Sequence, residues 1–208
     1  FSLLFIMLLS YHHVRNYNID PMQERDSKMN IYIYNCPNTF NYGSMMMGEN
    51  FISYFNKVTS KKNSYYVESM NEININRLKE ATSISEIYSV SMNSMFQEQL
   101  NKLDYVLAYI KIKRIISDFA NKIDLVVVLG GDDFTEDYGW KVPLMNAIKF
   151  NILKKENLAV VMLGQTMGPY HSFRKPAMKY LLNRIDAIYS RDPVTYNYLE
   201  SFGLKIYI

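Results

Sequence analysis

Short apolar runs alternate along this chain with apolar residues at helical spacing. The run at 124–131, DLVVVLGG, is apolar nearly throughout and is closed by glycines, which is typical of a parallel strand buried on both faces. Met47, Phe51 and Phe55 recur at helical steps and predict one face of a helix. The same patterns predict further strands at 30–35, 65–70, 158–165, 186–190 and 205–208, and further helices at 86–118, 141–155, 173–181 and 194–202.

This alternation of strands and helices predicts an α/β fold with a doubly wound, mostly parallel, Rossmann-like sheet. Ligands of such sheets bind at the carboxyl ends of the strands. Three polar segments, NTFNYGS, GGDDFTED and GQTMGPYHS, leave predicted strands at that edge. The segment at 71–94 shows no regular pattern, so we expect an exposed connection or a mobile flap there.

The two ends of the chain suggest its domain organisation. The apolar run at 3–9 is too short to span a membrane, which takes about 20 residues, and it lacks the flanking features of a signal peptide. We expect residues 1–28 to be a leader or upstream read-through without stable structure, with a weak membrane anchor as the alternative. Because the chain stops within an apolar run, we expect residues 29–208 to form an N-terminal Rossmann-like lobe that is truncated at its C-terminal end.

Composition narrows the class of protein. The chain has 208 residues, 49% of them hydrophobic, so a disordered chain is excluded. Its net charge is +3 without a polybasic run, so no nucleic-acid partner is expected. One cysteine rules out an intramolecular disulfide and favours a reducing compartment, which predicts a cytoplasmic protein, and we expect no metal site. The dinucleotide-binding, P-loop and nucleophile-elbow motifs are absent.

Four residues that end the most apolar strand are the first candidates for chemistry. The glycines Gly130 and Gly131 let a ligand or a neighbouring loop approach the backbone closely. The carboxylates of Asp132 and Asp133 can accept protons from sugar hydroxyls, one of them as a base. Alternatively, one caps the next element and the other is solvated. We predict Asp132 and Asp133 as the catalytic candidates because they lie at the ligand-binding edge.

Asn41, Tyr42, Gly43 and Ser44 precede a predicted helix. Backbone N–H groups at a helix start bind anions or sugar hydroxyls, so these residues are candidates for substrate binding. The alternative is a plain turn in which Ser44 caps the helix.

The polar turn after the strand at 158–165 gives further candidates. Gln165, Thr166 and Gly168 either contact a ligand through this turn or simply end the strand. His171, which follows closely, is either a general acid or base or an exposed loop residue.

Arg191 ends the strand at 186–190 and either binds an anion or pairs with Asp132 or Asp133. Asp192 is expected to cap the next helix. We expect Arg174, on the preceding helix, to be a solvated surface charge.

Four segments together resemble the polysaccharide pyruvyl transferase family, over about residues 29–208. Their motifs N-Y-G, G-G-D, G-Q-x-x-G-P and S-R-D are each weak but specific as a set. Many members carry Gly-Asp where this chain has Gly43-Ser44. The segments are NTFNYGSMMMGENF (38–51), DLVVVLGGDDFTED (124–137), LGQTMGPYHS (163–172) and DAIYSRDPVTYNYLESFGL (186–204).

The resemblance implies a fold like one lobe of a GT-B-type transferase, with this chain as the first of two lobes. It implies transfer of a pyruvyl group from phosphoenolpyruvate to a sugar of a cell-surface polysaccharide, as a ketal, in bacterial exopolysaccharide biosynthesis. Phosphoenolpyruvate is then the donor substrate and no cofactor is implied. The acceptor is a glycan or lipid-linked oligosaccharide, which fits peripheral association with the inner face of the membrane.

Donors of GT-B-like enzymes mostly lie on the second lobe, so the resemblance implies that this lobe binds the acceptor. Asp132 or Asp133 would contact or deprotonate it, and Arg191 would position the groups. Two alternatives stay open: a GT-B-type glycosyltransferase that uses a nucleotide-sugar, and a non-catalytic glycan-binding lobe.

Overall fold

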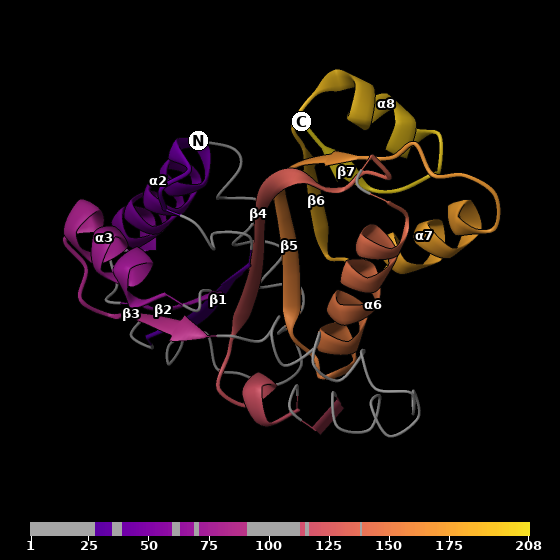
Figure 1. The fold of residues 1–208 in the computed structure, drawn as a ribbon. Helices are drawn as coiled ribbons and strands as arrows, with labels where there is room; N and C mark the ends of the chain where they lie inside the picture. Colours follow the sequence, from indigo (N-terminus) through magenta and orange to yellow (C-terminus); the bar gives the residue numbers. More distant parts are fainter. Residues whose placement is uncertain are drawn as a thin grey trace. The chain divides into compact units, whose positions relative to one another are not determined.

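A computed structural model describes residues 28–34, 39–59, 63–68, 71–90, 113–114, 117–137 and 139–208. It confirms the α/β fold, in which helices flank a seven-stranded parallel sheet (Figure 1). The strands are Asn30–Tyr34 (β1), Ser64–Glu68 (β2), Ile87–Val90 (β3), Leu125–Phe134 (β4), Ala159–Met167 (β5), Ala187–Ser190 (β6) and Ile206–Tyr207 (β7). The helices are Tyr42–Thr59 (α2), Glu72–Thr82 (α3), Lys141–Lys155 (α6), Arg174–Leu182 (α7) and Pro193–Glu200 (α8).

The strand order in the sheet is β3-β2-β1-β4-β5-β6-β7. The chain divides inside β4 into two compact units. We call the described residues 28–126 the N-terminal unit and residues 127–208 the C-terminal unit. Most of the predicted site residues belong to the C-terminal unit.

The N-terminal unit is built on β1, β2 and β3, which pair in parallel. Ile31 lies opposite Tyr65 and Tyr65 opposite Ile87, and all three side chains are completely buried. At the start of β4, Asp124 accepts the backbone N–H of Asn30 through Oδ2 at 2.9 Å and donates its own N–H to the Asn30 carbonyl at 2.8 Å. The starts of β1 and β4 are thus joined within this unit.

In the C-terminal unit, β5 pairs with β6 and β6 with β7, again in parallel. Helix α6 packs against β5 and α7, and α8 packs against β5, β6 and β7. Val127, Val128, Phe150 and Val160 are fully buried between these elements. The unbroken burial of β4 as far as Gly130 confirms a strand covered on both faces.

Two predictions for the N-terminal unit are wrong. The segment at 71–94, expected to be irregular, contains α3 and β3. Asn71 caps α3 by accepting the backbone N–H of Ile73 at 2.9 Å. This helix is short and rich in polar residues, so its apolar face carries little periodic signal. The predicted helix at 86–118 is wrong at its start, where Ile87–Val90 form β3; residues 113–114 and 117–118 are helical, and residues 91–112 and 115–116 lie outside the described residues.

The strands β4 and β5 are longer than predicted. β4 continues to Phe134 and β5 to Met167, so the paired aspartates and Thr166 lie in the last residues of strands, not in loops after them. Pairing within the sheet overrides the weak strand preference of Gly and Asp. The sheet itself therefore positions these candidates.

The predicted leader at 1–28 lies outside the described residues, apart from Lys28. Among the helices that the structure describes, none is long and apolar enough to cross a membrane.

Candidate active site

The carboxyl ends of β4, β5 and β6 form one edge of the C-terminal unit. Asp132 lies at the end of β4, Gln165 near the end of β5, and Arg191 directly after β6. The backbone N–H of Arg191 donates to the carbonyl of Gln165 at 3.0 Å, which ties the ends of β5 and β6 together. The structure therefore brings these three predicted residues to one edge.

β4 and β5 come into backbone contact at two glycines. A Cβ atom on Gly130 would overlap the carbonyl oxygen of Gly164. Gly164 has a φ of +67°, a conformation that favours glycine, and the register of β5 against β6 shifts between Leu163 and Gln165. The space beside Gly130 is thus filled by the neighbouring strand, and Gly130 shapes the edge of the sheet.

Gln165 supports β4 from within this contact. Its side chain is completely buried, and Nε2 donates to the carbonyls of Leu129 at 2.7 Å and Val128 at 3.2 Å. Buried carbonyls need donors, and the amide supplies them where the two strands are irregular. Gln165 was predicted to bind substrate, but its amide N–H groups are used inside the protein. Its Oε1 is buried and has no hydrogen-bond partner in the described part of the chain.

The two aspartates at the end of β4 differ in their surroundings. Asp132 is exposed, whereas Asp133 is half-buried and interacts with the rest of the protein. The carbonyl of Asp132 accepts both the N–H and the Oγ1 hydroxyl of Thr135, each at 2.9 Å, so the chain turns directly after this residue. Within the described residues, the Asp132 carboxylate makes no hydrogen bond or ion pair. It is therefore available to a ligand.

Arg191 is exposed, and its guanidinium forms no ion pair among the residues described here. The predicted alternative in which Arg191 pairs with Asp132 or Asp133 is therefore wrong for this structure. A guanidinium at a strand end can bind a carboxylate or phosphate in bidentate fashion.

Thr166 and Asp192 join β5 to the start of α8. Asp192 accepts the backbone N–H of Thr195 through Oδ1 at 2.8 Å, which confirms the predicted helix cap. Its Oδ2 accepts the hydroxyls of Thr195 at 2.9 Å and Thr166 at 3.4 Å. These bonds, chiefly that from the Thr195 backbone, hold the pKa of Asp192 below its ordinary value. The Thr166 hydroxyl, predicted to bind substrate, donates to this cap.

Glu136 binds a guanidinium beside the same edge. Arg174 donates to it in bidentate fashion, with Nε at 2.6 Å from Oε1 and Nη2 at 2.8 Å from Oε2. Arg174 is thus not the solvated charge predicted from the sequence. Its hydrogen bonds hold the pKa of Glu136 below the ordinary value. The exposed His171 places Nδ1 3.8 Å from Glu136 Oε2, so this candidate acid or base stands beside an ion pair.

Gly168 is required by packing. It has a φ of +71°, and a Cβ atom there would overlap the ring of Tyr198. The Tyr198 hydroxyl in turn accepts the backbone N–H of Tyr170 at 2.7 Å. Gly168 was predicted to contact substrate, but its missing side chain makes room for Tyr198.

The remaining candidates, Asn41 to Ser44, lie in the N-terminal unit at the start of α2. Asn41 Oδ1 accepts the backbone N–H groups of Gly43 at 3.0 Å and Ser44 at 3.3 Å. Asn41 therefore caps the helix, because the helix begins at Tyr42. The alternative prediction, in which Ser44 is the cap, is wrong. Two of the N–H groups expected to bind an anion are already satisfied, and the Tyr42 side chain is largely exposed.

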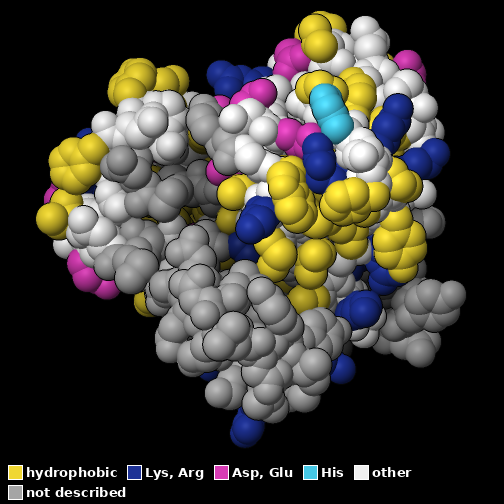
Figure 2. Space-filling model, turned by 45° about the vertical axis from the view of Figure 1, so that its right-hand side comes forward, with side chains coloured by type: hydrophobic (Ala, Val, Ile, Leu, Met, Phe, Trp, Pro, Cys, Tyr) yellow, Lys and Arg dark blue, Asp and Glu magenta, His cyan; other side chains and the backbone are white. Residues whose placement is uncertain are grey.

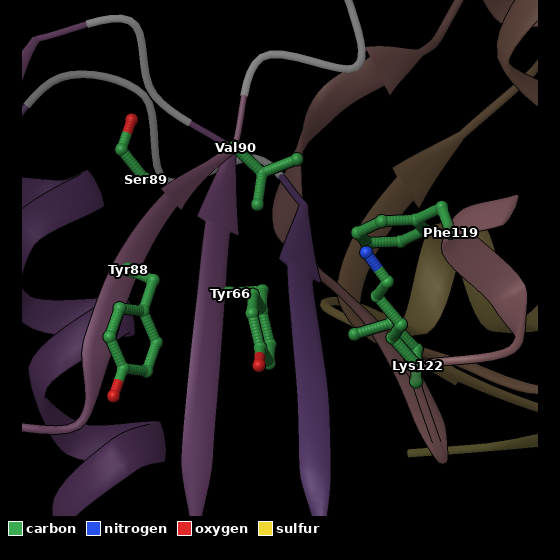
Figure 3. Close-up of a pocket in the computed structure, with 7 residues that line it drawn as sticks. Tyr66, Tyr88, Ser89, Val90, Phe119 and Lys122 are labelled. Atoms are coloured by element: carbon green, nitrogen blue, oxygen red, sulfur yellow. The ribbon is translucent and has the colours of Figure 1, made fainter. Parts of the chain in front are cut away.

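The N-terminal unit also contains an open cavity of about 310 Å³ (Figure 3). The rings of Tyr66 and Tyr88 stand side by side on neighbouring strands, and Lys122 and Phe119 line the other side. None of the described residues that line it was predicted as a site residue, and none of these is an aspartate, glutamate or histidine. In the described part of the chain, no three His, Cys, Asp or Glu side chains gather to hold a metal ion.

Comparison with known protein families gives a match over most of the chain. The model of the family described as polysaccharide pyruvyl transferase covers residues 14–208. The chain belongs to the polysaccharide pyruvyl transferase family. No curated protein matches the chain.

Membership in the pyruvyl transferase family confirms the family suggested by the four motif segments, and with it a transferase. The matched region contains every predicted site residue, from Asn41 to Arg191. It begins inside the segment at 1–28, further towards the N-terminus than the resemblance had extended.

Sequence reasoning missed part of the candidate site at the carboxyl ends of β4 and β5. Glu136 and Phe173 contact Arg174, yet neither was assigned a role at the site. The partners Glu136 and Arg174 are 38 residues apart, so no local pattern links them. The one signal that could have found them is that Glu136 lies in the turn after β4 and Arg174 at the start of the helix after β5.

Proposed function

We propose that this pyruvyl transferase moves a pyruvyl group from phosphoenolpyruvate to two hydroxyls of one sugar in a polysaccharide, forming a ketal and releasing phosphate. The observation that carries the proposal is a pair of groups at one edge that have no partner among the described residues: the exposed carboxylate of Asp132 and the exposed guanidinium of Arg191. A base and a cation at the same edge of the sheet suit a reaction between a hydroxyl and an anionic donor.

The atoms of the reaction balance as follows. A proton adds to the methylene carbon of the donor, which becomes the methyl group. The acceptor oxygen bonds to C2, the bond between C2 and the phosphate oxygen breaks, and a second hydroxyl closes the ketal. Two hydroxyl protons are released, of which one replaces the proton taken by the methylene carbon and the other leaves with phosphate. A base that accepts the hydroxyl proton is therefore needed.

Asp132 is assigned the role of this base. Its carboxylate is exposed at the end of β4, and the turn to Thr135 fixes its backbone. Asp133 is the weaker candidate, because it is half-buried and interacts with the protein. Arg191 is assigned the role of binding an anionic group of the substrate. Further contacts to the donor are expected from a second lobe, as the family resemblance implies.

The acceptor is proposed to be a glycan carried on a lipid at the cytoplasmic face of the membrane. The single cysteine supports a reducing compartment. Fractionation of cells should then recover part of the protein with membranes at low salt, and recovery of all of it in the supernatant would contradict this part of the proposal.

The function is tested by incubating the full-length protein with phosphoenolpyruvate and a polysaccharide acceptor, and measuring phosphate release together with ketal formation. Asp132→Asn is expected to lower the rate by about 10²- to 10⁴-fold, the usual contribution of a positioned base. Asp137→Asn is the matched control, because Asp137 is another exposed carboxylate of the same segment. An unchanged rate in Asp132→Asn would contradict the assigned base.

The same assay separates the alternatives. Nucleotide release from a sugar donor, without phosphate release from phosphoenolpyruvate, would show a GT-B-type glycosyltransferase. Binding of glycan with neither reaction would show a non-catalytic lobe.

A further inference from the structure

Two exposed aromatic residues stand where the chain enters the helices after β4 and β5. Trp140 directly precedes α6 and Phe173 directly precedes α7, with 39% and 64% of their surfaces exposed. Their rings meet edge to face, with centroids 6.0 Å apart and an interplanar angle of 79°. We call this pair the aromatic platform. Hydrophobic and basic side chains lie together on the face turned forward in Figure 2.

Neither aromatic side chain caps the helix that it precedes. Helix starts favour Ser, Thr, Asp or Asn, whose side chains accept backbone N–H groups, and Trp140 and Phe173 make no such bond. The residue before each aromatic has a positive φ, +104° at Gly139 and +55° at Ser172, and this conformation is unfavourable for serine. The backbone is thus strained at Ser172, directly before one of the two rings, and such strain is common at functional sites.

A fixed guanidinium borders the platform. The Arg174 guanidinium carbon lies 5.8 Å from the centroid of each ring. Two of its N–H groups bind Glu136, and both charged side chains are largely buried, at 19% and 13% exposure. A guanidinium has five N–H groups, so donors remain beside the rings. The border is therefore polar and rigid, while the centre is apolar.

We propose that the aromatic platform is a subsite that stacks against a sugar ring of the polysaccharide acceptor. A sugar ring offers apolar C–H groups on its face and hydroxyls around its rim, which match exposed aromatic faces bordered by hydrogen-bond donors. Glu136 neutralises Arg174, while Lys141, whose Nζ lies 5.9 Å from the centroid of the Trp140 ring, adds one positive charge and further N–H donors to the border. Two rings are also far smaller than the roughly 800 Å² that each partner buries in a standard protein interface.

This inference rests on the proposed function and adds where the acceptor is held. Trp140 follows β4, the strand that carries Asp132, and Phe173 follows the neighbouring strand β5. A glycan along this edge can place one sugar at Asp132 and another on the platform. The sugar on the platform does not react. The platform should therefore lower the KM for long acceptors and leave the kcat unchanged.

The subsite is tested by fluorescence, because Trp140 is the one tryptophan of the chain. Cello-, manno- and chito-oligosaccharides are titrated to about 10 mM without any donor, which detects a Kd of about 1 mM or tighter. At least one series should change the Trp140 emission saturably. Phe173→Ala should weaken that binding about ten-fold, while Phe173→Tyr, which keeps a ring, should stay within about two-fold of the parent.

Tyr180→Ala is the matched control. Tyr180 lies on α7, the helix that follows Phe173, and is 63% exposed. It also has a nearby arginine: the guanidinium carbon of Arg184 lies 5.7 Å from the centroid of the Tyr180 ring. Its removal should leave sugar binding unchanged. The proposal is overturned if none of the sugars changes the emission, or if Phe173→Ala binds them as the parent does.

Failure of this inference is distinguishable from failure of the proposed function. Sugar binding is measured without phosphoenolpyruvate, so it does not depend on transfer. If transfer occurs and Phe173→Ala leaves the KM for a long acceptor unchanged, the subsite is wrong and the function stands. If sugar binding depends on Phe173 and no transfer occurs, the subsite stands and the function is wrong.

Discussion

The predicted polar residues of the two units differ in how their hydrogen-bonding groups are used. In the N-terminal unit, Asn41 already accepts the N–H groups of Gly43 and Ser44. In the C-terminal unit, the charged groups of Asp132 and Arg191 find no partner among the described residues. The difference teaches that a polar motif before a helix or after a strand is not a site by itself. Groups left unused by the fold are the better candidates for binding a substrate.

The same contrast exists inside the C-terminal unit. Gly130 and Gln165 belong to the motifs that led to the family, yet the first contacts β5 and the second hydrogen-bonds β4. Substitution of such residues should lower stability, whereas substitution of the unused groups should lower activity. The following variants test this distinction.

Gly130→Ala should have the largest effect on stability. The added Cβ would overlap the Gly164 carbonyl, which is backbone and cannot rotate away. We expect a loss of about 3 kcal/mol, the upper part of the range for overpacking. Urea unfolding followed by circular dichroism measures it. Gly43→Ala is the control, since its Cβ would meet only ordinary contact with Asn41 at 3.4 Å, and it should not lose stability.

Gln165→Met should have the next largest effect. Methionine keeps the length of the side chain and removes both N–H groups, so the carbonyls of Val128 and Leu129 lose these donors. We expect a loss of about 2 kcal/mol, the cost of unsatisfied buried groups. If the variant is as stable as the parent but binds acceptor less well, the original prediction of Gln165 as a substrate contact would be right.

Much of this fold could be predicted because burial leaves a periodic signal. The apolar runs predicted β1, β4, β5 and β6, and helical spacing predicted α6 with its observed bounds, Lys141–Lys155. The prediction failed at α3 and β3, where only Ile75, Leu78 and Ile87 are buried apolar residues. A signal carried by so few side chains is not distinguished from an irregular segment.

The candidate site was predictable only as a set of motifs. Their order led to the family, but the use of each side chain depends on which strands are neighbours. Gln165 reaches β4 because β5 lies beside it, and Arg174 finds Glu136 across 38 residues of sequence. Such pairings follow from three-dimensional packing, so no single-sequence pattern reports them.

Asn41→Ala tests the helix cap of the N-terminal unit. Loss of a capping side chain costs about 1 kcal/mol, because backbone N–H groups lose their acceptor. Asp192→Ala is the matched variant in the C-terminal unit, where the cap accepts the N–H of Thr195. Urea unfolding should show similar losses in both. A loss of stability in Asp192→Ala alone would show that Asn41 does not cap α2 and that its amide is available to a ligand.

Glu136→Gln should have the smallest effect, because glutamine still accepts a hydrogen bond from Arg174. Its signature is a pH dependence. Arg174 lowers the pKa of Glu136 in the folded protein below the ordinary value of 4.5, so folding favours the ionised form. This contribution is complete above about pH 4.5 and is lost as the pH falls through the lowered pKa. The stability difference between the parent and Glu136→Gln, measured by urea unfolding, should therefore be greatest at neutral pH and shrink in acid.

Arg174→Lys, which keeps the charge and loses the fork geometry, should reproduce part of the neutral-pH loss. Parallel pH profiles of the parent and Glu136→Gln would mean that the pair does not hold Arg174 beside the aromatic platform.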